Sequence, residues 1–221
     1  RHNKRAKADE KNYHLVLLAQ NNTGYQNLIQ LVSKANLEGF YYKPRIDDEL
    51  LRQYHEGLIA LSACLHGEIP TLILSGQEQA ARDKILYYRE LFGPDNFYLE
   101  LQHNPNIRGQ EYVNQTLLKL GKELAVGLVA TNDAHYLNKE DDEPHDVLLC
   151  LQTKRKKKEV NRMNMLGEDF SVKTMRQMID DFKDTPEAID NTNKIASRCN
   201  VDIPLGQYQL PAFIVPAGYK E

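Results

Sequence analysis

The sequence predicts an α/β protein in which repeated β-α units build a parallel sheet, either open and doubly wound or closed into a barrel. Short apolar runs alternate with amphipathic stretches four or five times, with gaps of about 30 to 40 residues between most of the runs. Turn-forming residues separate them, as in Gly93-Pro94-Asp95-Asn96. A single domain is the simplest organisation for a chain of 221 residues.

The first half of the chain contains two expected strands. Residues 13–19 are an apolar run with His14 near its start, and cap chemistry at 21–23 opens a helix to about residue 35. Asp47 caps a short helix over 48–54, and the second strand, 58–62, leads into Ala63-Cys64. Helices are then expected from residue 67 and from 77 to about 92.

The second half repeats the pattern. We expect a strand over 97–101, a helix from about 109 to 124, and a buried strand over 127–130 that is followed by Asp133 and His135. A helix through 146–151, a short strand over 170–172 and helices over 174–182 and 186–199 complete the series. From residue 202 proline and glycine become frequent, which predicts an extended linker that leaves the domain.

Composition excludes several classes of protein. A net charge of −3 and a pI near 6.2 give no global basic field for nucleic acid. Three widely spaced cysteines without a C-x-x-C pair argue against a disulfide scaffold and for a reducing compartment, so we expect a cytoplasmic protein. No apolar run approaches the roughly 20 residues of a membrane span, so no membrane contact is expected. The charged start without an initiating methionine suggests a segment of a longer protein.

One dense cationic run, Lys154 to Lys158, stands apart from this mixed background. It has two interpretations. Such runs often do no more than keep a loop solvated, and this is the simpler interpretation. The alternative is contact with a phosphate backbone.

Residues that could bind a metal ion follow several of the expected strands. Asp133 and His135 form a D-x-H pair just beyond a buried strand, where reactive groups of parallel sheets and barrels gather. His14 and Cys64 lie beside two other strands. Imidazole, thiolate and carboxylate together suit zinc, or manganese where oxygen ligands are added. Each residue also has a simpler role, as a helix cap, a core histidine or a buried cysteine, and we interpret His66 and His103 as loop residues.

Several long segments resemble one known family. They match, in order and over nearly the whole chain, the polymerase-and-histidinol-phosphatase (PHP) domain of bacterial replicative DNA polymerase III α subunits of the DnaE-like class. The matching segments are YHLVLLAQNNTGYQNLIQLVSKA, EGFYYKPRID, GLIALSACLHGEIP, FYLELQ, VATNDAHYLNKEDDEPHDVLLCLQT and LPAFIVPAGY.

The resemblance implies a fold and a domain plan. It implies a distorted (β/α)7 TIM-like barrel, present here as a partial barrel without its first β-α units. Residues 1–203 would be the PHP domain, and 204–221 an extended linker toward the polymerase palm domain. The parent chain would be a DNA-directed DNA polymerase. Its partners would be DNA, the other domains of the α subunit and a proofreading subunit.

The resemblance also implies a ligand set. His14 matches the histidine of the family's third motif, Cys64 a later ligand, and Asp133 with His135 the final D-x-H; His103 has no secure counterpart. The cofactor would be a divalent metal, zinc or manganese, in a site that is incomplete in this chain. The family's H-x-H strand and its following acidic ligands are absent from this sequence, so we expect the 3′-5′ exonuclease type of activity to be missing from this segment alone. Alternatives are a structural module that docks a proofreading subunit, and a free-standing histidinol-phosphatase-like phosphoesterase.

Overall fold

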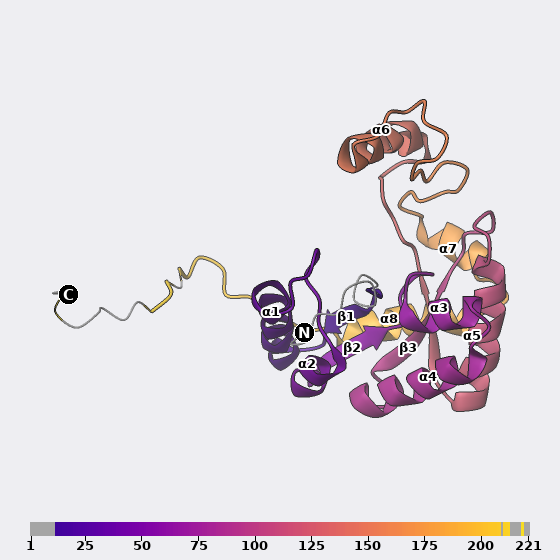
Figure 1. Ribbon diagram of the computed structural model, residues 1–221. Helices are drawn as coiled ribbons and strands as arrows, with labels where there is room; N and C mark the ends of the chain where they lie inside the picture. Colours follow the sequence, from indigo (N-terminus) through magenta and orange to yellow (C-terminus); the bar gives the residue numbers. More distant parts are fainter. Residues whose placement is uncertain (1–11, 209, 213–217, 219–221) are drawn as a thin grey trace.

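The computed structural model of the chain describes residues 12–208, 210–212 and 218. The charged start of the sequence, residues 1–11, therefore lies outside the described residues, as does part of the expected linker. The α/β class is confirmed, because strands and helices alternate along most of the described chain (Figure 1). No helix among the described residues is long and apolar enough to cross a membrane.

Four strands form one mixed sheet in the order β1 (Val16–Ala19), β2 (Leu58–Leu61), β3 (Phe97–Gln102) and β4 (Gly127–Thr131). The strands β2, β3 and β4 are parallel, as predicted. The prediction of a parallel sheet is wrong at β1, which runs antiparallel to β2. An apolar run packs equally well in either direction. The sequence pattern therefore predicts that the strand is buried but not whether it runs parallel or antiparallel to its neighbour.

A close backbone contact accounts for the direction of β1. The amide of Gln20 donates to the carbonyl of Gly57 at 2.9 Å, so the end of β1 lies beside the start of β2. A Cβ atom on Gly24 would lie only 1.9 Å from the same carbonyl oxygen. Only glycine allows the first turn of the next helix to approach this closely. The approach holds the end of β1 beside the start of β2.

The helices have boundaries close to those predicted. They are α1 (Asn22–Leu37), α2 (Asp48–Gln53), α3 (Glu68–Leu74), α4 (Glu78–Phe92), α5 (Gln110–Leu124), α6 (Asp142–Thr153), α7 (Met175–Asp181) and α8 (Pro186–Arg198), with a 3-10 turn η1 (Lys139–Asp141) before α6. The side chains of Asn21, Asp47 and Thr174 cap α1, α2 and α7, because each accepts a hydrogen bond from a backbone N–H group in the first turn of its helix. The predicted strand over 170–172 is only an isolated bridge between Ser171 and Tyr136.

The main core lies on one face of the sheet, between β2–β4 and the helices α3, α4 and α5 (Figure 1). Alternation along β3 assigns Phe97, Leu99 and Leu101 to this core. The opposite face has a smaller apolar cluster and then turns polar toward the carboxyl ends of the strands, where Glu100 and Gln102 are buried.

Helix α8 covers the edge of the sheet. Its Asn191 and Thr192 side chains donate to the carbonyls of Leu128 and Ala130 on β4, at 2.8 and 3.0 Å. These contacts satisfy strand carbonyls that would otherwise be free to pair with another strand. The sheet edge is thus closed by a helix within the described chain.

One segment stands away from this body. In Figure 1 the helix α6 and the loop after it lie apart from the sheet. The end of the loop returns to the body, where Asn106 donates hydrogen bonds to the Glu168 carboxylate and the Gly167 carbonyl. We call residues 137–169 the arm. The arm includes the whole cationic run.

Candidate functional site

The antiparallel direction of β1 brings the predicted site residues to the same edge of the sheet. The carboxyl ends of β2, β3 and β4 share one edge, since these strands are parallel. Because β1 is reversed, its beginning lies at that edge, and the His14 amide donates to the carbonyl of His66 at 3.0 Å. His14, Cys64, Asp133 and His135 therefore all lie beside one rim.

The first pair in the site joins β1 to the loop after β2. The Sγ atom of Cys64 lies 3.5 Å from Nδ1 of His14 and 3.9 Å from Nδ1 of His66. The two imidazole rings are 5.5 Å apart, centre to centre. We interpreted His66 as a loop residue, and it does lie exposed on a loop, but it also belongs to this cluster. Its C-x-H spacing from Cys64 was the available signal.

The second pair lies beyond β4. Nε2 of His135 is 3.4 Å from Oδ1 of Asp133, and both side chains are well exposed. The backbone amide of His135 donates to the carbonyl of Phe170 at 2.8 Å, and the Phe170 ring stands edge-on to the imidazole. The His145 ring of α6 also lies close to His135, with ring centres 5.7 Å apart. The second pair therefore sits where the arm leaves the body.

The electrostatics connect the two pairs. Burial raises the pKa of the Cys64 thiol, and the carboxylates of Asp133 and Glu100 raise it further, against the opposing effect of the His66 backbone amide. The charge of Asp133 thus affects the pKa of Cys64 across the rim. A thiol with a raised pKa holds its proton more tightly, so a metal ion would have to displace that proton.

Glu100 is a charged residue of the site that the sequence analysis missed. It is 6% exposed in the middle of β3, and its Oε1 atom accepts from Thr131 at 2.6 Å and from Gln102 at 3.1 Å. Its Oε2 atom is buried without a hydrogen-bond partner among the described residues. Burial raises the pKa of this carboxyl, and Asp133 adds to the effect. A glutamate inside the apolar run FYLELQ was the signal in the sequence.

The donor types suit a divalent metal, but the geometry does not complete a site. Nitrogen, sulfur and carboxylate oxygen are the ligands that zinc prefers. Within residues 12–208, however, no group of three or more histidine, cysteine, aspartate or glutamate side chains is arranged to hold a metal ion. The described residues provide two separate groups of donors, one around Cys64 and one around Asp133, and on their own they do not form a metal centre.

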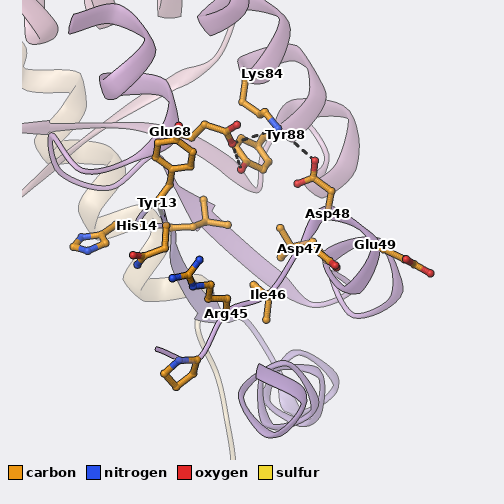
Figure 2. Close-up of a pocket in the computed structure, with 14 residues that line it drawn as sticks. Tyr13, His14, Arg45, Ile46, Asp47, Asp48, Glu49, Glu68, Lys84 and Tyr88 are labelled. Carbon is orange, nitrogen blue, oxygen red and sulfur yellow. Dashed lines mark hydrogen bonds and ion pairs between the residues drawn. The ribbon is translucent and has the colours of Figure 1, made fainter. Parts of the chain in front are cut away.

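A cavity of about 820 Å³ adjoins the first pair, and His14 forms part of its wall. Figure 2 shows Glu68, Tyr88, Lys84 and Asp48 gathered on one side of it, with the His14 ring turned away from them. The Lys84 ammonium is 3.3 Å from Glu68 and 3.4 Å from Asp48, and the Tyr88 hydroxyl donates to Glu68 at 3.1 Å. Burial alone would lower the pKa of Lys84, but the two carboxylates outweigh it and the pKa is raised.

His103, which has no secure counterpart in the family's ligand set, has a separate partner. Its Nδ1 atom lies 3.2 Å from Oδ1 of Asp181 on α7, and Lys173 contacts the other carboxylate oxygen at 2.6 Å. These contacts attach α7 to the end of β3. The contact of His103 in the described chain is therefore a structural one.

The chain is similar to one family model and to several proteins of known name. The family model described as "PHP domain" matches residues 3–104. DNA polymerase III subunit alpha of Borreliella burgdorferi is 46% identical over 205 residues, covering 90% of this chain and 18% of that protein. The subunits of Treponema pallidum and Thermus aquaticus are 45% and 44% identical, covering 92% and 95% of the chain but 17% and 18% of those proteins.

These matches confirm the resemblance to the PHP domain of DNA polymerase III α subunits. The chain spans less than one fifth of the length of the curated relatives it matches. The similarity extends well beyond residue 104, so it includes Asp133 and His135 as well as His14 and Cys64.

Proposed function

We propose that this chain is the PHP portion of a bacterial replicative DNA polymerase III α subunit, and that the complete protein synthesises DNA in the cytoplasm. The observation that carries the proposal is similarity over 90% or more of the chain to proteins of that name from several bacteria. No residue of this chain is assigned to nucleotide transfer. Polymerisation, DNA and the other α-subunit domains as partners belong to the longer protein.

For the fold we propose a partial, distorted (β/α)7 barrel over residues 1–203, followed by an extended linker over 204–221. Three parallel strands with their ligands at the carboxyl edge support it. The described part of the linker also supports the proposal, because it forms no strand or helix. Just before the linker, Asp202 is held to the start of α1 by two hydrogen bonds with Asn22.

For the site we propose that His14, Cys64, Asp133 and His135 are ligands of divalent metal, zinc or manganese, in the complete polymerase. Their place on one rim and their donor types support this. Two donor pairs need additional ligands from outside the described residues. When bound, such an ion would acidify a water molecule and polarise a phosphodiester. This chain's own contribution is to hold the donors at the rim.

The test uses the full-length protein that carries this segment. Template-dependent nucleotide incorporation should be present, and its absence would reject the polymerase assignment. Tightly bound zinc and manganese, measured by elemental analysis, should fall in Cys64→Ser and Asp133→Asn but not in the matched controls Cys199→Ser and Asp202→Asn. Equal metal content in all four variants would reject the ligand assignment.

A structural role, with docking of a proofreading subunit, is the second candidate function. The two candidates differ in what Asp133→Asn does to the full-length protein. A catalytic PHP site predicts loss of metal-dependent 3′-5′ nucleotide removal at unchanged melting temperature. A structural module predicts a lower melting temperature, with no such cleavage in either protein.

A further inference from the structure

The cationic run at the end of α6 forms an ordered turn. We call residues 154–158 the cationic turn; all five side chains are exposed. The amide of Arg155 donates to the carbonyl of Cys150 at 2.9 Å, which fixes the start of the turn to the helix. Glu159 then closes it, because its carboxylate accepts from the Lys156 amide and its own amide donates to the Lys156 carbonyl, both at 2.9 Å.

Lys154 occupies a backbone conformation that favours glycine. Its φ angle is +55°, in the left-handed region, and it ends α6 there. A glycine would adopt this conformation without the steric cost that a Cβ atom brings. The chain nevertheless has a lysine at this position. A residue in an unfavourable backbone conformation is a reason to look for a role of its side chain.

A buried ion pair holds the return limb of the loop against α6. Arg162 forms two hydrogen bonds with the Asp146 carboxylate, at 2.5 and 2.7 Å, and both side chains are almost fully buried. The Arg162 Nε group also donates to the carbonyl of Lys157 at 3.2 Å. The guanidinium therefore ties the cationic turn directly to the helix, so that much of its ordering is already complete before any ligand binds.

Acidic partners account for only part of the positive charge. Arg155 contacts Glu159 at 3.3 Å and Lys157 contacts Glu143 at 3.4 Å, both on the surface. Lys154, Lys156 and Lys158 have no carboxylate within ion-pair distance among the described residues. The turn thus presents three unneutralised ammonium groups on a chain whose overall charge is negative.

We propose that the cationic turn binds the phosphate backbone of DNA through Lys154, Lys156 and Lys158. This inference rests on the proposed function, which supplies DNA as the ligand. Phosphate is favoured over a protein partner because lysine is depleted in protein–protein interfaces, whereas lysine and arginine provide the sequence-independent part of DNA binding. The arm, standing away from the body in Figure 1, leaves the turn open to a ligand of this size.

The test is the salt dependence of DNA binding by the full-length protein. The triple variant K154A/K156A/K158A should reduce the slope of log affinity against log salt concentration by about 2 to 3, since each lost phosphate contact contributes roughly 0.9. Fluorescence anisotropy of a labelled primer–template duplex measures this. The matched control K122A/K183A/K194A removes the same charge from exposed positions in the body and should leave the slope nearly unchanged.

Two additional measurements separate this proposal from folding defects and from the proposed function. Lys154→Gly suits the left-handed conformation, so it should keep the turn folded while reducing the slope by about 0.9. Nucleotide incorporation at saturating DNA should be the same in all variants. Equal slopes in the triple variant and its control would overturn the proposal, even if polymerase activity is present. A protein that binds DNA with the predicted slopes but incorporates no nucleotide would reject the proposed function alone.

Discussion

The body and the arm are stabilised by different interactions. In the body, the central strand β3 is buried on both sides, and Phe97 and Leu99 are fully inaccessible to solvent. In the arm, Leu151, Val160 and Met163 are largely exposed, and an ion pair between Asp146 and Arg162 is buried beside the apolar residues Leu149 and Cys150 of α6. Apolar burial is non-directional and tolerates small shifts, whereas a two-point ion pair fixes one geometry. The body therefore provides stability and the arm provides a fixed shape.

The largest expected effect is in the body. Leu99→Ala should lower the free energy of unfolding by about 3 kcal/mol, because a fully buried leucine is replaced by a cavity. Leu151→Ala in the arm, where the side chain is 71% exposed, should change it by less than about 0.5 kcal/mol. Urea unfolding measures both. Similar losses for the two variants would contradict the contrast between body and arm.

The next effect is local to the arm. Asp146→Asn should open the loop over 154–166 to protease while leaving the body folded, since the buried Arg162 loses its charge partner. Limited proteolysis with mass spectrometry measures the cleavage sites. Glu143→Gln, which removes only the exposed contact with Lys157, is the control and should behave as the parent chain does. Cleavage throughout the body in Asp146→Asn would show that the arm is not independent.

The ion pair also predicts the response of the arm to acid. The Arg162 guanidinium holds the pKa of Asp146 below its ordinary value. A carboxyl with a lowered pKa contributes stability that is present above its unfolded-state pKa and is lost as pH falls toward the folded-state pKa. Acidification of the parent chain should therefore expose the same cleavage sites as Asp146→Asn. A loop that stays protected through this titration while the body unfolds would contradict the prediction.

Glu100 in the body predicts the opposite pH dependence. Burial raises the pKa of this carboxyl, so its contribution is complete below the unfolded-state pKa and is lost as pH rises through the folded-state pKa. Glu100→Gln should therefore be more stable than the parent chain at neutral pH, and the difference should shrink in acid. Thermal unfolding across pH measures it, with exposed Glu187→Gln as the control. A loss of stability at neutral pH would mean that the folded chain uses the charged form.

The smallest effect is at the end of α6. Lys154→Gly should slow hydrogen exchange in the arm by an amount equivalent to about 0.5 to 1 kcal/mol, because the left-handed conformation favours glycine. Lys158→Gly is the matched control: its φ angle is not positive, so added backbone freedom should speed exchange instead. If both substitutions changed the rate of hydrogen exchange in the same direction, the backbone of Lys154 would not be strained.

Some features of the site could be predicted from the sequence and others could not. The D-x-H pair was predictable from its place just after a buried apolar run. Asp133 and His135 come together at 3.4 Å in a turn where the Ala134 amide donates to the Asn132 carbonyl at 2.8 Å. The approach of Cys64 to His14 follows from the reversed direction of β1, which no local pattern records. The role of Glu100 in the site was not predicted, because an apolar run such as FYLELQ predicts a buried strand whether or not one of its residues is ionisable.

The sequence by itself determined the alternation of elements, the positions of nearly all the helices, and the residue types that gather near the strand ends, because these depend on local periodicity and capping. Only the tertiary structure decided the direction of β1, the closure of the β4 edge by α8, and the separation of the arm from the body. These features depend on contacts between residues far apart in the chain, such as Gln20 with Gly57 and Asn191 with Leu128. Their free energy is gained only when the whole sheet has formed.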